Sequence, residues 1–176
     1  MNRGRLIVFE GGEASGKSTQ AARLAADLGA LLTREPGGTA VGERIRAVVL
    51  DPDAGVLDRR AEALLLAADR AQHVAEVVEP TLARGEDVVS DRFIPSSLAY
   101  QGYGRGLDLD ELRRLSAWAS AGLEPDLVIL LDVPPDVARA RRAAAADPER
   151  WVVVDGTGDV DEVAKRVREA AGALIR

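Results

Sequence analysis

The sequence contains no cysteine and only one histidine, His73. The absence of cysteine excludes disulfide bonds, thiolate zinc sites and cysteine nucleophiles. A single histidine is too few for a histidine-built metal site, so any bound metal must take oxygen ligands. Oxygen ligands favour Mg²⁺ over zinc.

Negative charge exceeds positive charge, with 29 acidic against 23 basic residues, so the formal net charge is −6; lysine occurs only at Lys17 and Lys165. An acidic chain lacks the basic face that nucleic-acid binding needs, so we expect no nucleic-acid partner. No apolar run approaches the roughly 18 residues that a membrane span requires, and no signal peptide is recognisable. We therefore expect a cytoplasmic protein that does not contact a membrane.

Apolar strand patterns and amphipathic helix patterns alternate along the 176 residues, a length that suits one domain. We expect strands at 5–10, 30–33, 87–91, 127–133 and 151–154. We expect helices at 17–28, 41–50, 57–84 with a break near Pro80, 96–101, 109–121 with Asp108 as N-cap, 135–146 and 159–175. The glycine-rich stretch 102–106 is expected to be a flexible loop. The alternation predicts a single-domain, three-layer α/β/α fold around a parallel sheet.

A glycine-rich segment, Gly11–Ser18, lies between the first expected strand and the first expected helix. It matches G-x-x-x-x-G-K-[ST], which in this context indicates a P-loop and hence a P-loop NTPase fold that binds ATP. Glycines let backbone N–H groups approach phosphate oxygens, and the helix N-terminus adds partial positive charge. Lys17 suits the β- and γ-phosphates, and the Ser18 hydroxyl suits Mg²⁺. The expected nucleotide-binding residues are Gly11, Gly12, Glu13, Ala14, Ser15, Gly16, Lys17, Ser18 and Thr19.

Two of the expected strands end in an aspartate, Asp91 and Asp132. Either carboxylate could face the phosphates, because ligands bind at the carboxyl ends of parallel strands. A strand-end aspartate that only caps a turn is the alternative in each case. Arg92 directly follows Asp91 and adds a phosphate-binding group, so we favour Asp91 as the second Mg²⁺ ligand beside Ser18.

The shortage of histidine and cysteine also bears on the acceptor, because neither is available as a general base. A phosphate acceptor needs none, since its oxygen is already an anionic nucleophile. The composition therefore favours a nucleoside monophosphate kinase over a kinase that deprotonates a hydroxyl.

Five segments together resemble the bacterial thymidylate kinases, over residues 6 to about 135. They are Phe9–Thr19, Thr33–Thr39, Ala67–His73, Asp91–Gly102 and Gly122–Pro134. This resemblance implies transfer of the γ-phosphate of ATP to dTMP, giving dTDP and ADP for dTTP synthesis. It also implies that Mg²⁺ assists the transfer and that the protein is a homodimer.

The resemblance further implies roles for single residues. Arg34 and Arg92 would bind the acceptor phosphate, and Glu13 would lie by the sugar and the reacting phosphates. Arg70, helped by Ser97 and Gln101, would hydrogen-bond the thymine edge, while Tyr100 would disfavour ribonucleotides. The expected substrate-binding residues are Arg34, Pro36, Leu66, Arg70, Arg92, Ser96, Ser97, Tyr100 and Gln101. The expected catalytic residues are Glu13, Lys17, Asp91, Arg92, Arg142 and Arg150.

Helix periodicity, taken without the resemblance, gives a different reading of Arg70. It places Arg70 on a helix surface, paired with a glutamate at helical spacing. His73 is interpreted as a structural, hydrogen-bonded helix residue.

The chain departs from the family pattern at two places. Leu66 occupies the position, four residues before Arg70, where the family usually has a phenylalanine that stacks on thymine. We expect weaker dTMP binding there, because an aromatic stack contributes about 0.5–1.5 kcal/mol. The family's arginine-bearing lid is also shortened here, to about residues 136–150, which leaves Arg142 or Arg150, with Arg139, as the source of a catalytic arginine.

These departures keep two other functions open. The chain could bind nucleotide with little or no catalysis, or it could be a related kinase for another nucleoside monophosphate or a deoxynucleoside. The retained Lys17, Ser18, Asp91 and Arg92 favour an active kinase.

Overall fold

The structure is a computed structural model that describes residues 3–12, 15–53, 55–132 and 150–172. Its strands are β1 (Leu6–Gly11), β2 (Leu31–Arg34), β3 (Val88–Asp91), β4 (Leu127–Asp132) and β5 (Trp151–Asp155). Its helices are α1 (Lys17–Leu28), α2 (Ala40–Leu50), α3 (Arg59–His73), α4 (Glu79–Ala83), α5 (Ile94–Ser97), α6 (Leu109–Ala119) and α8 (Val160–Gly172), with π-helical segments η1 (Val74–Val78) and η2 (Leu98–Gly104).

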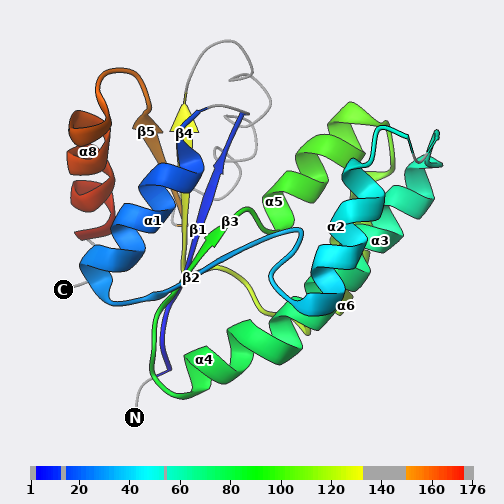
Figure 1. The fold of residues 1–176 in the computed structure, drawn as a ribbon, viewed down its shortest axis with the longest axis horizontal. Helices are drawn as coiled ribbons and strands as arrows, with labels where there is room; N and C mark the ends of the chain where they lie inside the picture. The colour runs from blue at the N-terminus through cyan, green and yellow to red at the C-terminus, as the bar shows by residue number, and fades with distance from the viewer. Residues whose placement is uncertain (1–2, 13–14, 54, 133–149, 173–176) are drawn as a thin grey trace. The chain divides into compact units, whose positions relative to one another are not determined.

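The strands form a five-stranded sheet in the order β2-β3-β1-β4-β5, and helices α1 and α8 pack against it (Figure 1). β1 pairs in parallel with β3 and β4, and β4 pairs in parallel with β5. The three central strands, β3, β1 and β4, are buried along nearly their whole length, as a parallel sheet covered on both faces requires, whereas the edge strands β2 and β5 are largely exposed or half-buried. The predicted α/β/α fold around a parallel sheet is confirmed, and α1 and β4 begin where they were expected.

The described residues group into two compact units whose segments alternate along the chain. The first unit is made from residues of 1–33, 81–91 and 125–176, and the second from 34–80 and 92–124. The first unit contains nearly all of the sheet with α1 and α8, and the second contains α2, α3, α5 and α6.

The core of the first unit lies between the central strands and helices α1 and α8. Ile7 and Phe9 of β1 are fully buried there, beside Leu24 of α1 and Val167 of α8. Gly29 ends α1 as predicted, because its φ of 64° lies in the left-handed region that glycine adopts readily.

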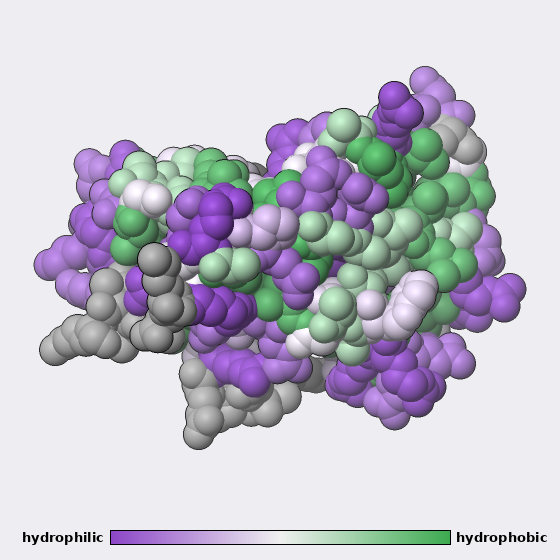
Figure 2. Space-filling view, turned by 90° about the horizontal axis from the view of Figure 1, so that it is seen from below, coloured by the Kyte–Doolittle hydropathy of each residue, from purple (hydrophilic) through white to green (hydrophobic). Residues whose placement is uncertain are grey.

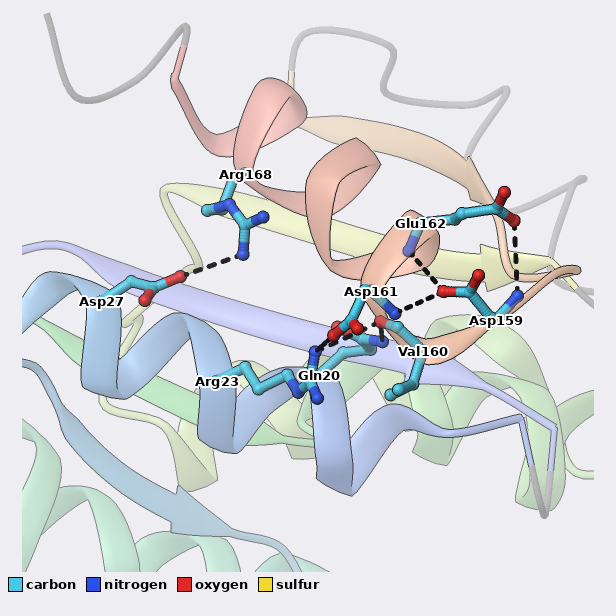
Figure 3. A network of polar contacts seen from close by, with 8 residues as sticks. All are labelled: Gln20, Arg23, Asp27, Asp159, Val160, Asp161, Glu162 and Arg168. Carbon is cyan, nitrogen blue, oxygen red and sulfur yellow. Dashed lines mark hydrogen bonds and ion pairs between the residues drawn. The ribbon is translucent and has the colours of Figure 1, made fainter.

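Polar contacts also join α1 to the start of α8 (Figure 3). The Gln20 side-chain amide donates to the carbonyl of Val160 at 2.9 Å, and Arg23 pairs with Asp161 at 2.5 Å. Asp159 accepts hydrogen bonds from the N–H groups of Asp161 and Glu162, so it caps the first turn of α8. These contacts fix the amino end of α8 against α1.

Two carboxylates bind the chain where β1 begins. The N–H of Arg5 donates to Asp87 and the N–H of Leu6 donates to Asp126, each at 2.7 Å. The Arg5 guanidinium also pairs with Asp87 at 2.5 Å. Burial opposes ionisation of Asp87, but its hydrogen bonds from Arg5 hold the pKa of this carboxyl below its ordinary value.

Helix α3 packs against both α2 and α6 in the second unit. Each of these helices begins at a polar cap: Thr39 accepts from Gly42, Asp58 from Arg60, and Asp108 from Asp110 and Glu111. Capping satisfies N–H groups that the first helical turn leaves without an intrahelical acceptor. The prediction of Asp108 as N-cap is confirmed.

Two predictions in this region, one of a helix and one of a loop, need correction. The helix expected over 57–84 starts at Arg59 and changes to the π-helical segment η1 at Val74, before Pro80 is reached. Pro80 is the second residue of α4 and follows η1 without a break in the helix, so the wide turn of η1 lies directly before the residue that lacks a backbone N–H. The expected glycine-rich loop is also wrong, because Gly102 and Gly104 belong to η2. Gly102 is buried there, and a Cβ at this position would lie 2.5 Å from Leu109.

Among the helices in the described part of the chain, none is both long and apolar enough to cross a bilayer.

Candidate functional site

The P-loop follows β1, and its glycines hold backbone conformations that other residues adopt poorly. Gly11 has a φ of 146°, and a Cβ there would lie 2.7 Å from the carbonyl oxygen of Leu131. Gly16 has a φ of 83° and directly precedes α1. In the described residues, no side chain caps this helix and no acidic residue lies in its first turn. The N-terminus of α1 therefore presents free positive potential that suits a phosphate.

Lys17 is buried against the loop, with its Nζ donating to the carbonyl oxygen of Gly12 at 2.6 Å. The loop therefore holds the ammonium group at the start of α1 rather than in solvent. Ser15 Oγ is also buried and has no hydrogen-bond partner among the described residues. A buried hydroxyl without a partner is costly, so this loop is suited to a ligand that supplies phosphate oxygens.

Ser18 and Asp91 come together beside the loop. The hydroxyl of Ser18 donates to Asp91 Oδ2 at 2.6 Å, and β3 places Asp91 opposite Phe9 of β1. Asp91 Oδ1 is buried and has no partner in the part of the chain that the structure describes. Of the two strand-end aspartates, Asp91 is therefore the one that contacts the P-loop serine.

The Ser18–Asp91 pair fits Mg²⁺, because it supplies a hydroxyl and a carboxylate as oxygen ligands. One oxygen of that carboxylate, Asp91 Oδ1, has no hydrogen-bond partner among the described residues. Within the described ranges, no group of three or more His, Cys, Asp or Glu residues could hold a metal. Mg²⁺ commonly uses one or two protein oxygens and takes its other ligands from phosphates and water. The donor set thus matches a cation bound together with a nucleotide.

In the second unit, a buried glutamate joins residues from three segments. Glu35 Oε2 accepts from Arg70 Nε at 2.9 Å, and Glu35 Oε1 lies 2.9 Å from His73 Nδ1. Arg70 also donates to Ser97 Oγ at 3.0 Å and lies over the ring of Phe93 at 5.3 Å. Arg70 is therefore a buried residue held in one orientation, and its predicted place on a helix surface is wrong.

The loop before α2 is fixed by two residues of α3. Asp69 accepts from the N–H of Gly37 at 3.0 Å, and burial raises the pKa of this carboxyl. His73 is fully buried, and a Cβ on Gly38 would lie 2.3 Å from its ring. His73 is thus the hydrogen-bonded structural residue that was expected, and it also sets how closely the loop approaches α3.

A second buried carboxylate on α3 holds Gln101. Glu62 Oε1 accepts from Gln101 Nε2 at 2.7 Å, and Glu62 Oε2 accepts from Arg105 at 2.9 Å. Gln101 is 4% exposed, and its Oε1 has no hydrogen-bond partner among the described residues. Each end of the Glu62 carboxylate is therefore used, whereas one end of the Gln101 amide is not.

Arg92, which directly follows β3, has a φ of 77°, uncommon for a residue with a side chain. Such a conformation costs about 1–3 kcal/mol and persists only where surrounding contacts enforce it. Here the guanidinium donates to Ser96 Oγ at 3.1 Å and lies over the Tyr100 ring at 5.2 Å. The strained backbone directs this arginine toward the segment 96–100.

Comparison with known proteins places these features in one family. A family model described as thymidylate kinase matches residues 9–151. The thymidylate kinase of Leifsonia xyli subsp. xyli is 48% identical over 196 positions, covering 94% of this chain and 93% of that protein. That of Solidesulfovibrio magneticus is 42% identical, covering 96% of this chain and 99% of that protein. A crystal structure of thymidylate kinase from Ehrlichia chaffeensis matches with a TM-score of 0.87 at 33% identity, covering 99% of this chain and 100% of that one.

The chain belongs to the thymidylate kinase family. Membership confirms the resemblance found in the sequence, the P-loop kinase fold and the expected class of activity, an ATP-dependent nucleoside monophosphate kinase. The Leifsonia alignment spans more positions than this chain supplies, because 94% of 176 residues is fewer than 196 positions. That relative therefore has residues without a counterpart in this member of the family.

The remaining substrate residues expected for a thymidylate kinase lie in varied surroundings. Arg34 is about half exposed and pairs with Glu43 at 2.7 Å. The carbonyl of Pro36 accepts from Arg46 at 2.9 Å. Leu66 is half-buried on α3, one turn before Arg70, so the two share a helix face.

Arg150 is the expected catalytic residue that the structure contradicts. It precedes β5, and its carbonyl oxygen accepts from the N–H of Val128 at the start of β4. The P-loop instead follows the other end of the sheet, where Gly11 pairs with Leu131 and Leu131 pairs with Val154. Arg150 precedes Val154, which is level with the P-loop end of the sheet, by four strand residues, which is about 13 Å. The chain must return to the amino-terminal edge before it enters a parallel strand, so Arg150 cannot lie beside the P-loop.

Several predictions lie outside the described residues. They concern Glu13 and Ala14 of the P-loop, the catalytic candidates Arg139 and Arg142, and most of the shortened lid at 136–150.

Sequence reasoning missed three site residues, Glu35, Glu62 and Asp69. Each is a carboxylate with little exposure that fixes another site residue or loop. A signal did exist for Glu62, because it lies four and eight residues before Leu66 and Arg70 on one helix face. Glu35 and Asp69 lie next to motif residues in sequence, but nothing local indicates their burial.

Proposed function

We propose that the chain works as a thymidylate kinase that transfers the γ-phosphate of ATP to dTMP, giving dTDP and ADP. The observation that carries this proposal is the Ser18–Asp91 pair beside a complete P-loop, with Asp91 Oδ1 buried and unused. This is the arrangement that a phosphoryl-transfer enzyme needs, because its catalysis rests on positioning and charge stabilisation.

On the donor side, the loop N–H groups and Lys17 hold the β- and γ-phosphates, as the motif requires. Ser18 and Asp91 hold Mg²⁺, which when bound neutralises charge on the phosphates during transfer. The buried position of Lys17 supports this role, because a restrained ammonium group needs no reordering when the nucleotide binds.

On the acceptor side, Arg92 and Arg34 bind the phosphate of dTMP. Arg92 supports this assignment best, since its strained backbone and its contacts with Ser96 and Tyr100 restrict its orientation. Arg34 would exchange its exposed pairing with Glu43 for the phosphate, at little cost because exposed ion pairs contribute little. Arg70 and Ser97 meet the thymine edge, with Gln101 beside them.

The function is tested by measuring ADP release from ATP with a panel of nucleoside monophosphates, with and without Mg²⁺. We expect release to be fastest with dTMP and to stop when EDTA removes the metal. If none of the monophosphates stimulates ADP release although ATP binding is measurable, the proposal is contradicted. That outcome would leave a nucleotide-binding member of the family without efficient transfer.

We propose that residues 136–150 form a shortened lid within a single domain, and that Arg142 supplies the catalytic arginine. The surplus positions of the Leifsonia relative support a deletion in this chain. Arg142 takes precedence over Arg150, because Arg150 lies at the amino-terminal edge of the sheet.

Replacement of Leu66 by phenylalanine is expected to strengthen dTMP binding. Leu66 and Arg70 share a face of α3, so an aromatic ring at position 66 would lie against a base held by Arg70. A gain of about 0.5–1.5 kcal/mol corresponds to a KM for dTMP that is about two- to thirteenfold lower. The KM for ATP serves as the control and should not change. An unchanged KM for dTMP would show that residue 66 does not stack on the base.

We also propose that the protein is a cytoplasmic homodimer that buries part of its α2–α3 surface. Val41 and Val48 of α2 and Leu64 of α3 are each 45–58% exposed, although all three are large apolar residues. Figure 2 shows hydrophobic residues grouped on the side of the molecule that carries these helices. Large exposed apolar residues of this kind suit burial in a protein interface. Sedimentation at micromolar concentration should give a dimer, and a monomer would contradict the proposal.

A further inference from the structure

Glu62 is buried on α3 although it is not one of the residues expected to touch a substrate. Its two carboxylate oxygens accept separate hydrogen bonds, one from Gln101 Nε2 at 2.7 Å and one from Arg105 at 2.9 Å. Arg105 is 58% exposed, whereas the Glu62 side chain is 11% exposed. The contact with Arg105 therefore fixes Glu62 from the solvent side, and the contact with Gln101 extends inward.

The chemistry of this pair decides how the amide of Gln101 is turned. An ionised carboxylate can only accept hydrogen bonds, so the NH₂ group of Gln101 must face Glu62. The carbonyl oxygen of the amide then faces the other way. This Oε1 is buried and has no hydrogen-bond partner among the described residues, so it can accept a hydrogen bond from a bound ligand.

The position of Gln101 links this acceptor to the base site. Gln101 lies four residues after Ser97, which contacts Arg70. On α3, Glu62 lies eight residues before Arg70 on the same helix face, and it contacts Gln101. The pairs Glu62–Gln101 and Arg70–Ser97 thus join the same two segments on either side of Leu66. A pyrimidine held by Arg70 therefore meets a hydrogen-bond donor on one side and an acceptor on the other.

We propose that Glu62 is a positioning residue that holds the carbonyl oxygen of Gln101 toward the pyrimidine and thereby selects bases with an N3–H donor. The inference rests on the proposed function and deepens it. Thymine and uracil carry N3–H next to a C4 carbonyl, so both groups are satisfied by Gln101 and Arg70. Cytosine presents an acceptor at N3 and an amine at C4, and both would face groups of the wrong kind.

The test is Glu62→Gln, which changes one atom of the carboxylate. Arg105 can only donate, so the new amide is expected to turn its oxygen toward Arg105 and its NH₂ toward Gln101. Gln101 must then rotate its own NH₂ toward the base, where it opposes N3–H and suits cytosine. We expect the ratio of kcat/KM for dTMP over dCMP to fall at least about fivefold, because a buried group loses its partner.

A second ratio separates positioning from general damage to the fold. dTMP and dUMP have the same hydrogen-bonding edge and differ only in a methyl group, so their kcat/KM ratio should not change in Glu62→Gln. In a Gln101→Leu background, Glu62→Gln should leave the dTMP-to-dCMP ratio unaltered, because no amide remains to turn. Glu76→Gln is the matched control, since it alters an exposed Gln72–Glu76 hydrogen bond of the same length, 2.7 Å.

The wild-type protein is measured first, so that the two proposals can fail separately. If it phosphorylates no monophosphate, the proposed function fails, and calorimetric affinities for dTMP and dCMP then replace kcat/KM in the same comparison. An unchanged dTMP-to-dCMP ratio in folded Glu62→Gln would overturn the role of Glu62. If Glu62→Gln does not fold, Arg105→Leu is measured instead. A fall in its dTMP-to-dCMP ratio, smaller than the roughly fivefold fall expected for Glu62→Gln, supports the positioning role of Glu62, and an unchanged ratio overturns it.

Discussion

Replacement of Lys17 by alanine is expected to lower kcat with dTMP by about 10²–10³-fold, the effect of removing one preorganised charge donor from a phosphoryl- or acyl-transfer site. The structure supports a loss of that size because Lys17 is 6% exposed and held by the Gly12 carbonyl. The ammonium group is therefore already in place before the nucleotide binds. Steady-state ADP release at saturating ATP and dTMP measures the effect.

The sequence offers a matched control in Lys165, since it contains only these two lysines. Lys165 lies on α8, is 74% exposed and approaches Glu169 at 3.9 Å. Lys165→Ala should keep the wild-type kcat, because an exposed ion pair contributes little. A kcat for Lys17→Ala within threefold of wild type would mean that Lys17 does not act on the transferred phosphate.

Replacement of Glu35 by glutamine is expected to lower the free energy of unfolding by about 3–5 kcal/mol, the usual result of removing one partner from a buried ion pair. The Glu35 and Arg70 side chains are each 4% exposed, and their contact is 2.9 Å long. Glutamine would leave the guanidinium of Arg70 buried without the carboxylate that it contacts. Urea unfolding at neutral pH measures the loss.

Glu43→Gln separates burial from charge. Glu43 pairs with Arg34 at 2.7 Å, a contact no longer than that of Glu35, but the two side chains are 48% and 53% exposed. This substitution should cost at most about 1 kcal/mol, because solvent screens an exposed pair. Equal losses from the two variants would show that Glu35 does not balance a buried charge.

The features that sequence predicts well in this protein are those with local causes. The glycine at position 29 ends α1, and the carboxylate of Asp108 starts α6, because each acts within one turn of its own position. The P-loop is equally local, since its ligand groups are mostly the backbone of consecutive residues. The placement of Asp91 beside Ser18 needed only the rule that parallel strands end at one edge.

The features that sequence did not predict depend on contacts between distant segments. Glu35 and Arg70 meet across 35 positions of the chain, and no local pattern indicates that the pair is buried. The segments η1 and η2 likewise have the composition of ordinary helix or loop, and only packing shows their wider turns. The error at Arg150 was avoidable, because the return of the chain to the start of β5 follows from parallel pairing alone.

The two aspartates at the start of β1 act on the P-loop from the opposite edge of the sheet. Asp87 accepts a hydrogen bond from the backbone N–H of Arg5, and Asp126 accepts one from the backbone N–H of Leu6. The strand runs from there to Gly11 without a bulge in its pairing with β4, so its starting point determines how far the loop projects. These carboxylates therefore set the position of the nucleotide-binding loop relative to the sheet. Substitutions at Asp87 or Asp126 would alter ATP binding although neither residue contacts ATP.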